Sequence, residues 1–149
     1  MTYSPRSYPL TWLVVLAIHV LCLMPVPETP LDGIAFIDKW THLVMYGGLC
    51  LTIWYEVFLH HGMKPLIHLS QVKTETLNWR HLRIGALYLP TFLGAYIEVL
   101  QATCTNGTRS GDVIDWLADT LGVLIAWGVA WMVIRGIRKV RKVRKVRKV

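Results

Sequence analysis

The sequence predicts an all-α, polytopic integral membrane protein with four transmembrane helices. Of its 149 residues, 54% are hydrophobic and 17% are charged, and the mean hydropathy of +0.42 is high for a soluble domain of this length. Four apolar windows are long enough to cross a hydrocarbon layer about 30 Å thick. These windows lack the alternation typical of barrel strands, and a helix satisfies its own backbone groups in lipid, so each window is expected to be helical.

The four predicted spans cover residues 10–26, 40–59, 82–103 and 113–134. Because Arg6 precedes the first window, a cleaved signal peptide is an alternative interpretation of it. A transmembrane helix is favoured, since no small-x-small cleavage site follows the window. The fourth window carries small residues every four positions from Ala118, which favours close packing of another helix, within the chain or in a second copy as a homo-oligomer. We therefore expect a four-helix membrane domain at residues 1–134.

Residues 135–149 form a basic, low-complexity tail that repeats the triplet RKV. Basic residues close to an anionic membrane surface contribute about 1 kcal/mol each, so we expect the tail to anchor the chain on the inner leaflet. Nucleic acid is not an expected partner, because no aromatic residues alternate with the charges. The valines of the repeat do not fall on one helical face, which predicts that the tail lacks regular structure in isolation.

The distribution of basic residues predicts the orientation. With four spans, both termini and the loop around residues 60–81 share one side of the membrane, and that side holds every one of the 16 Lys and Arg residues except Lys39 and Arg109. Basic loops remain in the cytoplasm, so both termini are expected there. The short connections at residues 27–39 and 104–112 are then expected outside, together with most of the acids.

The ionisable residues of the last three spans are expected to meet near this outer surface. Asp112, Asp115 and Asp119 are spaced i, i+3 and i+7 and so share a helical face. The third span should bring Glu98 to the same depth, and the second should bring His42. Charges are costly in lipid and persist most easily as a paired cluster. The candidate ligand-binding residues are Asp38, Lys39, His42, Glu98, Gln101, Arg109, Asp112, Asp115 and Asp119.

Each candidate has a structural interpretation beside its functional one. Glu98 either makes a packing hydrogen bond or faces an outward cavity, and His42 is either a general base or a donor to a carboxylate. Arg109 is expected to pair with Asp112 and Asp115, or else to bind a phosphate or carboxylate. Asp112 also has the position of a helix cap.

No motif in the chain specifies a reaction, a metal or a cofactor. The sequence has no HExxH, GxSxG or phosphate-binding glycine loop, and its three cysteines lack metal-ligand spacing. We therefore expect no metal and no cofactor, and the chain's status as an enzyme stays open. If it is one, His42 and Glu98 are the candidate catalytic residues.

Three segments in order, DKWTH at 38–42, YIEVLQ at 96–101 and TRSGDVIDWLADTLG at 108–122, resemble the VanZ-like family of small bacterial membrane proteins. The resemblance covers about residues 36–126. It implies roles for the residues that match the family's pattern, which are Asp38, Lys39, His42, Glu98, Gln101, Arg109, Asp115 and Gly122. At Asp119 the family more often has Asn.

The resemblance implies a bacterial inner-membrane factor linked to the cell envelope and to low-level resistance to teicoplanin-type glycopeptides. Its expected partners are the lipid bilayer and either a cell-wall precursor or the glycopeptide. The leading expectation is a binding factor with an outward-facing polar pocket. The alternatives are a membrane enzyme that acts on a lipid-linked substrate and a proton-coupled transporter.

Overall fold

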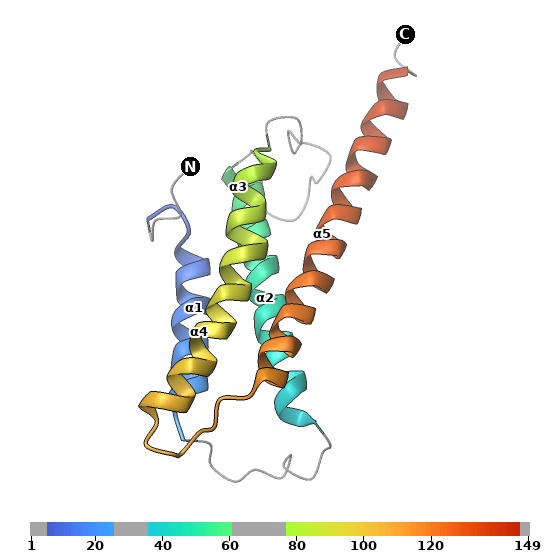
Figure 1. Ribbon diagram of the computed structural model, residues 1–149. Coiled ribbons are helices and arrows are strands. Elements are labelled where there is room, and N and C mark those ends of the chain that lie inside the picture. Colours follow the sequence, from blue (N-terminus) through green and yellow to red (C-terminus); the bar gives the residue numbers. More distant parts are fainter. Residues whose placement is uncertain (1–5, 26–35, 61–76, 147–149) are drawn as a thin grey trace.

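The computed structural model describes residues 6–25, 36–60 and 77–146, and within these ranges all regular structure is helical. The elements are α1 (Pro9–Leu23), α2 (Ile37–His60), α3 (Trp79–Arg83), η3 (Ile84–Tyr88), α4 (Leu89–Cys104) and α5 (Val113–Val146). Because α3, η3 and α4 follow one another without a break, they form one continuous rod. The described helices therefore make four rods (Figure 1).

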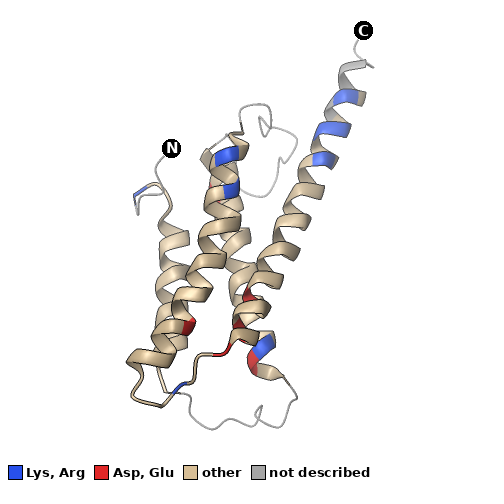
Figure 2. Ribbon diagram, in the orientation of Figure 1, with Lys and Arg blue, Asp and Glu red and all other residues tan. Residues whose placement is uncertain are grey.

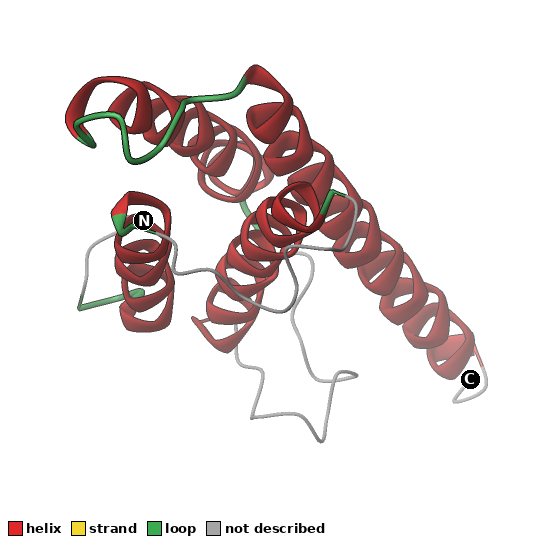
Figure 3. Ribbon diagram, turned by 90° about the horizontal axis from the view of Figure 1, so that it is seen from below, coloured by secondary structure: helices red, strands yellow, loops and turns green. Residues whose placement is uncertain are grey.

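The four rods lie side by side and alternate in direction. Helix α1 begins, and α5 ends, at the same end of the bundle, whereas the other end holds the termini of α1, α2, α4 and α5 that lead into the short connections (Figures 1 and 3). We call this second end the connection end. Helix α2 packs against α5 over most of its length and also contacts α1 and α4, so it is central in the bundle. Its position explains why it holds Trp54 and Tyr46, two of the largest fully buried side chains.

The closest approach between helices joins α2 and α5 through glycines. A Cβ atom added to Gly122 would lie 2.2 Å from the carbonyl oxygen of Leu43 and 3.1 Å from the backbone nitrogen of Gly47. A Cβ on Gly47 would in turn lie 3.2 Å from the carbonyl oxygen of Gly122. The backbones of the two helices therefore touch, as small residues allow in membrane helix pairs.

The rod formed by α3, η3 and α4 contains one π-helical turn. Asn78 begins the rod, because its side chain accepts hydrogen bonds from the backbone N–H groups of Arg80 and His81. Pro90 has no N–H group to donate to the preceding turn, and the π turn at Ile84–Tyr88 lies just before it. The turn absorbs this interruption, and the rod continues to Cys104.

Aromatic side chains fill the core at the end of the bundle away from the short connections. The indole ring of Trp54 is almost fully buried and lies 5.1 Å from Trp127, 5.4 Å from Phe58 and 6.3 Å from Trp79, measured between ring centroids. Tilted and edge-to-face aromatic pairs of this kind add stability beyond their buried area. This cluster joins α2, α3 and α5.

Glu56 connects α2 to the first turn of α1. Its carboxylate accepts the backbone N–H of Leu10 at 2.8 Å, the N–H of Thr11 at 2.9 Å and the Thr11 hydroxyl at 2.6 Å. Glu56 is buried, with 3% of its surface exposed. An anion at a helix N-terminus is favourable, so Glu56 serves as a cap supplied by another helix.

Among the described residues, three stretches are long and apolar enough to cross a membrane, namely Ile37–His60, Trp79–Cys104 and Val113–Val140. The first predicted span, residues 10–26, corresponds to α1, a shorter apolar helix of 15 residues. Large hydrophobic side chains are exposed along the outside of the bundle, including Leu13, Val44, Phe92 and Leu121. These surfaces are compatible with contact with a lipid bilayer.

The described part of the basic tail continues α5. The helix runs without a break from Val113 through the expected domain boundary at residue 134 to Val146. The sequence predicts a tail without regular structure in isolation, whereas here the tail extends an existing helix and so avoids the cost of nucleation. Figure 2 shows its basic residues at the end of the bundle opposite to most of the acids.

Candidate functional site

The nine predicted candidate residues lie together at the connection end of the bundle. Helix α2 supplies Asp38, Lys39 and His42 from its first two turns, and α4 supplies Glu98 and Gln101 from its last two turns. The connection after α4 and the first turns of α5 supply the rest, which are Arg109, Asp112, Asp115 and Asp119. Helical spacing places the residues of each helix on one face, and the packing of α2 against α4 and α5 turns these faces toward one another.

Lys39 is the cation of the cluster. Its ammonium nitrogen lies 2.6 Å from Asp115 Oδ1, 2.9 Å from Asp112 Oδ2 and 3.7 Å from Asp38 Oδ2. The Asp115 side chain is 6% exposed, so this carboxylate depends on Lys39 for its compensation. Lys39 thus holds the start of α2 to the start of α5.

Asp112 links the ion pair to the buried part of the site. Its Oδ1 atom accepts the backbone N–H of Ile114 at 2.9 Å, which caps α5, and its own backbone N–H donates to Glu98 Oε2 at 2.7 Å. The hydrogen bond from Lys39 is the main reason that the pKa of the Asp112 carboxyl lies below its usual value. The capping role suggested by the sequence is confirmed, but Asp112 also orients Glu98.

His42, Glu98 and Asp119 form the buried centre of the site. His42 Nδ1 lies 3.0 Å from Asp119 Oδ1 and 3.8 Å from Glu98 Oε1. The three residues are 3%, 8% and 0% exposed, respectively. Two carboxylates therefore face a single imidazole in a position that bulk water does not reach.

Three polar atoms around this centre have no hydrogen-bond partner among the described residues. They are Glu98 Oε1, Asp119 Oδ2 and the hydroxyl oxygen of Tyr46, which lies one helical turn beyond His42 on α2. Buried polar groups are nearly always paired, so each of these atoms needs an explanation. Asp119 also fits closely against α4, since a Cβ atom on Gly94 would lie 2.6 Å from Asp119 Oδ2.

Arg109 and Gln101 bind the C-terminal end of α1. The Arg109 guanidinium donates to the carbonyl oxygens of Leu21 and Met24, both at 3.3 Å, and Gln101 Nε2 donates to the carbonyl oxygen of Cys22 at 2.9 Å. Carbonyls at the end of a helix lack partners within the helix, and a cation is favourable there. The side chains of α4 and of the connection after it therefore cap α1.

The predicted pairing of Arg109 with Asp112 and Asp115 is wrong. In the described ranges Arg109 makes no ion pair within 4.0 Å, and Lys39 takes the position beside both acids. Helical periodicity could not show this, because Arg109 lies in an irregular connection whose direction depends on the position of α1.

An open cavity of about 260 Å³ adjoins the buried centre, and His42 belongs to both. Its lining is almost entirely polar and combines carboxylates with a lysine and an arginine. The lining residues are Asp38, Lys39, His42, Gln101, Thr108, Arg109, Ser110, Asp112 and Asp115. The sequence did not single out Thr108 and Ser110, although both flank Arg109 in the chain.

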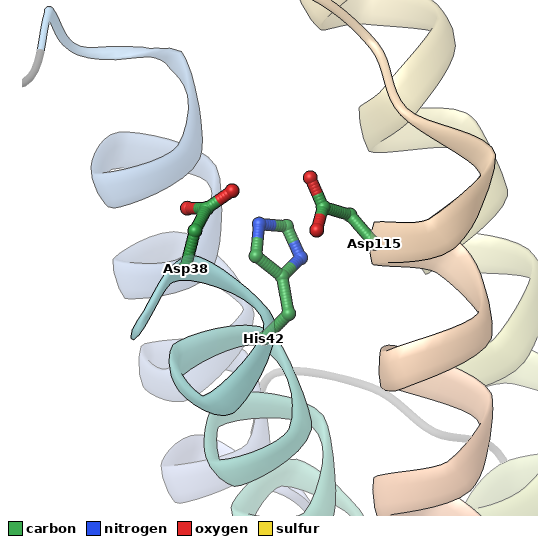
Figure 4. A group of neighbouring side chains, drawn as sticks. All are labelled: Asp38, His42 and Asp115. Carbon is green, nitrogen blue, oxygen red and sulfur yellow. The ribbon is translucent and has the colours of Figure 1, made fainter. Parts of the chain in front are cut away.

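The ring of His42 separates two groups of possible ligand atoms. Figure 4 shows the ring between the carboxylates of Asp38 and Asp115, and these atoms lie within 4.8 Å of one another. The second group consists of His42, Glu98 and Asp119, again within 4.8 Å, and it is fully buried. The two groups differ in how the negative charge of their acids is balanced. Lys39 contacts both acids of the first group but neither acid of the second.

The site can therefore hold a polar group in the cavity and a cation or proton in the centre beneath it. The predicted residues Asp38, Lys39, His42, Gln101, Arg109, Asp112 and Asp115 reach the cavity, whereas Glu98 and Asp119 lie in the buried centre only. Comparisons of this chain with known protein families, with curated proteins and with solved structures found no match.

Proposed function

We propose that this chain is a VanZ-like protein of the bacterial cytoplasmic membrane that binds the polar part of a cell-envelope component. The observation that carries the proposal is the open cavity of about 260 Å³, which has a lining of both acidic and basic groups at one end of an apolar bundle. Ligand sites use a few placed polar groups for orientation. A cavity at the end of the helices is accessible to a molecule that stands at the membrane surface.

The distribution of charge supports an outward-facing cavity. Arg80 and Arg83 on the α3 rod, and Arg135, Arg138 and Lys139 on α5, lie at the end of the bundle away from the cavity (Figure 2). Basic residues mark the cytoplasmic side, so both termini are inside and the cavity is outside. In this arrangement α1 also spans the membrane, in addition to the three longer stretches. Its length of about 22 Å is less than the thickness of the hydrocarbon layer, so the bilayer must thin locally around it.

Thiol labelling tests this orientation with the chain's own cysteines. Cys104 is free and exposed at the cavity end, whereas Cys22 and Cys50 are buried. A membrane-impermeant thiol reagent added to intact cells should label the wild type and not Cys104→Ser. A Ser7→Cys, Cys104→Ser variant should be labelled only after the cells are opened. Labelling of residue 7 from outside would reverse the topology and overturn the proposal.

The cavity suits a ligand with both an amino and an anionic group. Asp38 is its most exposed carboxylate, with half of the side chain accessible, and contacts Lys39 only at 3.7 Å. The Arg109 side chain is bound to α1 and also lines the cavity. Lipid-linked cell-wall precursors and teicoplanin-type glycopeptides both carry charged groups of the two signs, and either one is a candidate.

Direct binding tests the ligand class. The full-length protein in nanodiscs would be titrated separately with lipid-linked peptidoglycan precursor and with teicoplanin. Asp38→Asn should weaken binding of the true ligand about tenfold, as expected for loss of one charged hydrogen bond. Thr52→Val, in an apolar depression on the outside of the bundle, is the matched control and should have no effect. Absence of binding by the wild type to both compounds would refute the proposal.

A cellular measurement addresses the envelope role. Expression of the wild type should raise the tolerance of a susceptible strain to teicoplanin, and His42→Ala and Glu98→Gln should remove this effect while the protein still inserts into the membrane. If both variants protect as well as the wild type, the polar cluster is structural only.

A second candidate function is a membrane enzyme acting on a lipid-linked substrate. The hydrogen bond between His42 and Asp119 favours it, because a carboxylate that orients an imidazole is a common arrangement for a general base. Formation of product from labelled lipid-linked precursor by the purified protein, lost in His42→Ala, would favour the enzyme over the binding factor. Proton-coupled transport has less support, because Glu56, the buried acid toward the other end, is occupied in capping α1.

A further inference from the structure

The buried centre beneath the cavity has the composition and spacing of a metal site. We propose that His42, Glu98 and Asp119 bind one divalent transition-metal ion of the Zn²⁺ type. This site shares His42 with the cavity, but Glu98 and Asp119 do not line the cavity, so the metal content of the wild type and its binding of an envelope component are separate measurements. The two proposals can therefore fail independently.

The separations of the donor atoms fit a single ion. Zinc bonds to histidine nitrogen and carboxylate oxygen are about 2.0–2.2 Å long, so two ligands of a tetrahedral ion lie about 3.3 Å apart. His42 Nδ1 is 3.0 Å from Asp119 Oδ1 and 3.8 Å from Glu98 Oε1, on either side of that value. All three donor atoms lie within 4.8 Å of one another.

The unpaired atoms of the centre point to a missing positive group. Asp119 is fully buried and Glu98 nearly so, and each keeps one carboxylate oxygen without a hydrogen-bond partner. Neither acid lies within 4.0 Å of a described Lys or Arg. A divalent ion would balance the two carboxylates beside a neutral imidazole, whereas a proton on His42 balances only one of them.

The surroundings of the three ligands support the proposal. The Asp112 backbone N–H donates to Glu98 Oε2 and leaves Oε1 directed at the centre. The carboxylates of Asp38 and Asp115 lie on either side of the His42 ring (Figure 4), with atoms of the three residues within 4.8 Å of one another. A carboxylate behind a histidine ligand fixes the ring and its tautomer, which is the usual outer shell of zinc sites.

The group formed by Asp38, His42 and Asp115 is less suited to a metal ion. The ammonium of Lys39 lies 2.6 Å from Asp115 and 3.7 Å from Asp38, so a fixed cation already compensates these acids. The buried centre, in turn, is less suited to Ca²⁺ or Mg²⁺ than to Zn²⁺. These ions prefer six or more oxygen ligands, and the centre offers a nitrogen and few oxygens.

Metal content measures the proposal directly. The protein, purified without a histidine tag, would be stripped with chelator, loaded with Zn²⁺, desalted and analysed by mass spectrometry for bound metal. We expect about one Zn²⁺ per wild-type chain and at least a tenfold loss in Asp119→Asn and in His42→Ala. His19→Ala, which changes a histidine outside the centre and its outer shell, should retain the ion.

Loading with Co²⁺ gives a second readout that does not depend on the variants. A Co²⁺ ion with one nitrogen and a few oxygen ligands in a tetrahedral site gives a visible absorption band, which Zn²⁺ but not Mg²⁺ should displace. A wild type that retains no ion after loading overturns the proposal even if the variants fail to fold. Loss of the ion in Asp38→Asn with retention in Asp119→Asn would also overturn it, because it would assign the metal to the other group.

Discussion

A Cβ atom on Gly122 would lie 2.2 Å from the carbonyl oxygen of Leu43, so the backbones of α5 and α2 are in direct contact at that point. This contact lies one turn beyond Asp119 on α5 and one residue beyond His42 on α2. The register that brings these two side chains together is therefore fixed by the lack of a side chain at residue 122.

Gly122→Ala should separate the two helices and destabilise the bundle. Overpacking of a close contact costs about 1–3 kcal/mol, and here the neighbouring atoms belong to the backbone and cannot rotate away. Gly128→Ala and Gly136→Ala on the same helix are controls, because a Cβ atom at either position meets nothing within 4 Å. Thermal unfolding in detergent should show a lower midpoint for Gly122→Ala alone, and equal midpoints for all three variants would contradict the contact.

Lys39 and Asp115 should show strong energetic coupling. Lys39→Met leaves the nearly buried Asp115 carboxylate without its cation, at a cost of about 1–3 kcal/mol. Adding Asp115→Asn should recover part of that loss, so that the double variant is more stable than the sum of the single changes by about 0.5–3 kcal/mol. The same cycle with Asp38, which is half exposed, should give a coupling below about 1 kcal/mol. Equal coupling energies for Asp115 and Asp38 would show that burial of the acid does not determine the strength of its ion pair with Lys39.

Loss of the Glu56 carboxylate should free the start of α1. Glu56→Leu removes three hydrogen bonds and leaves two backbone N–H groups in the bundle without partners, which costs at least about 1.5–3 kcal/mol. Thr11→Ala removes only the hydroxyl bond and should cost about 1 kcal/mol. Hydrogen exchange should accelerate at the amides of the first turn of α1 in Glu56→Leu, while the amides of α5 keep their protection. Unchanged exchange in α1 would mean that its packing alone holds it.

Arg109→Gln should loosen the opposite end of α1. The guanidinium contacts the carbonyl oxygens of Leu21 and Met24 through bonds of 3.3 Å, which are long, so the expected loss is about 0.5–1.5 kcal/mol. Faster labelling of buried Cys22 by a small thiol reagent would report the loosening. Cys50, buried at mid-bundle, is the internal reference and should react as slowly as in the wild type. A rise in both rates would instead indicate general unfolding.

The positions of the helices follow closely from the sequence, because hydrophobic length and helical period are local properties. Window 40–59 is contained in α2 (Ile37–His60), and window 82–103 is contained in the rod Trp79–Cys104. The meeting of His42, Glu98 and Asp119 at one level is also predictable, since alternating helices and a rise per residue fix the depth of each side chain.

Specific partners did not follow from the sequence. Glu56 and Arg109 both bind the ends of α1, and a helix terminus offers backbone groups that no side-chain pattern reveals. Lys39 replaces Arg109 beside Asp115 because the start of α2, rather than the connection before α5, lies over that acid. The assignment of a cap or an ion pair depends on how the rods are placed around one another, and that placement depends on packing over long sequence separations.

The length of α5 sets where its last charges stand. A helix of 34 residues measures about 51 Å, against about 30 Å for the hydrocarbon layer, and about 18 Å of it follows residue 134. Arg135 and Arg138 rest on the indole rings of Trp131 and Trp79 and so stay near the lipid boundary. Lys142 lies eight positions past residue 134, about 12 Å farther along the helix, which is comparable with the distance of about 8–10 Å over which salt screens a surface charge. The described basic residues therefore stand at increasing distances from the apolar part of the helix, with Arg135 nearest and Lys142 farthest.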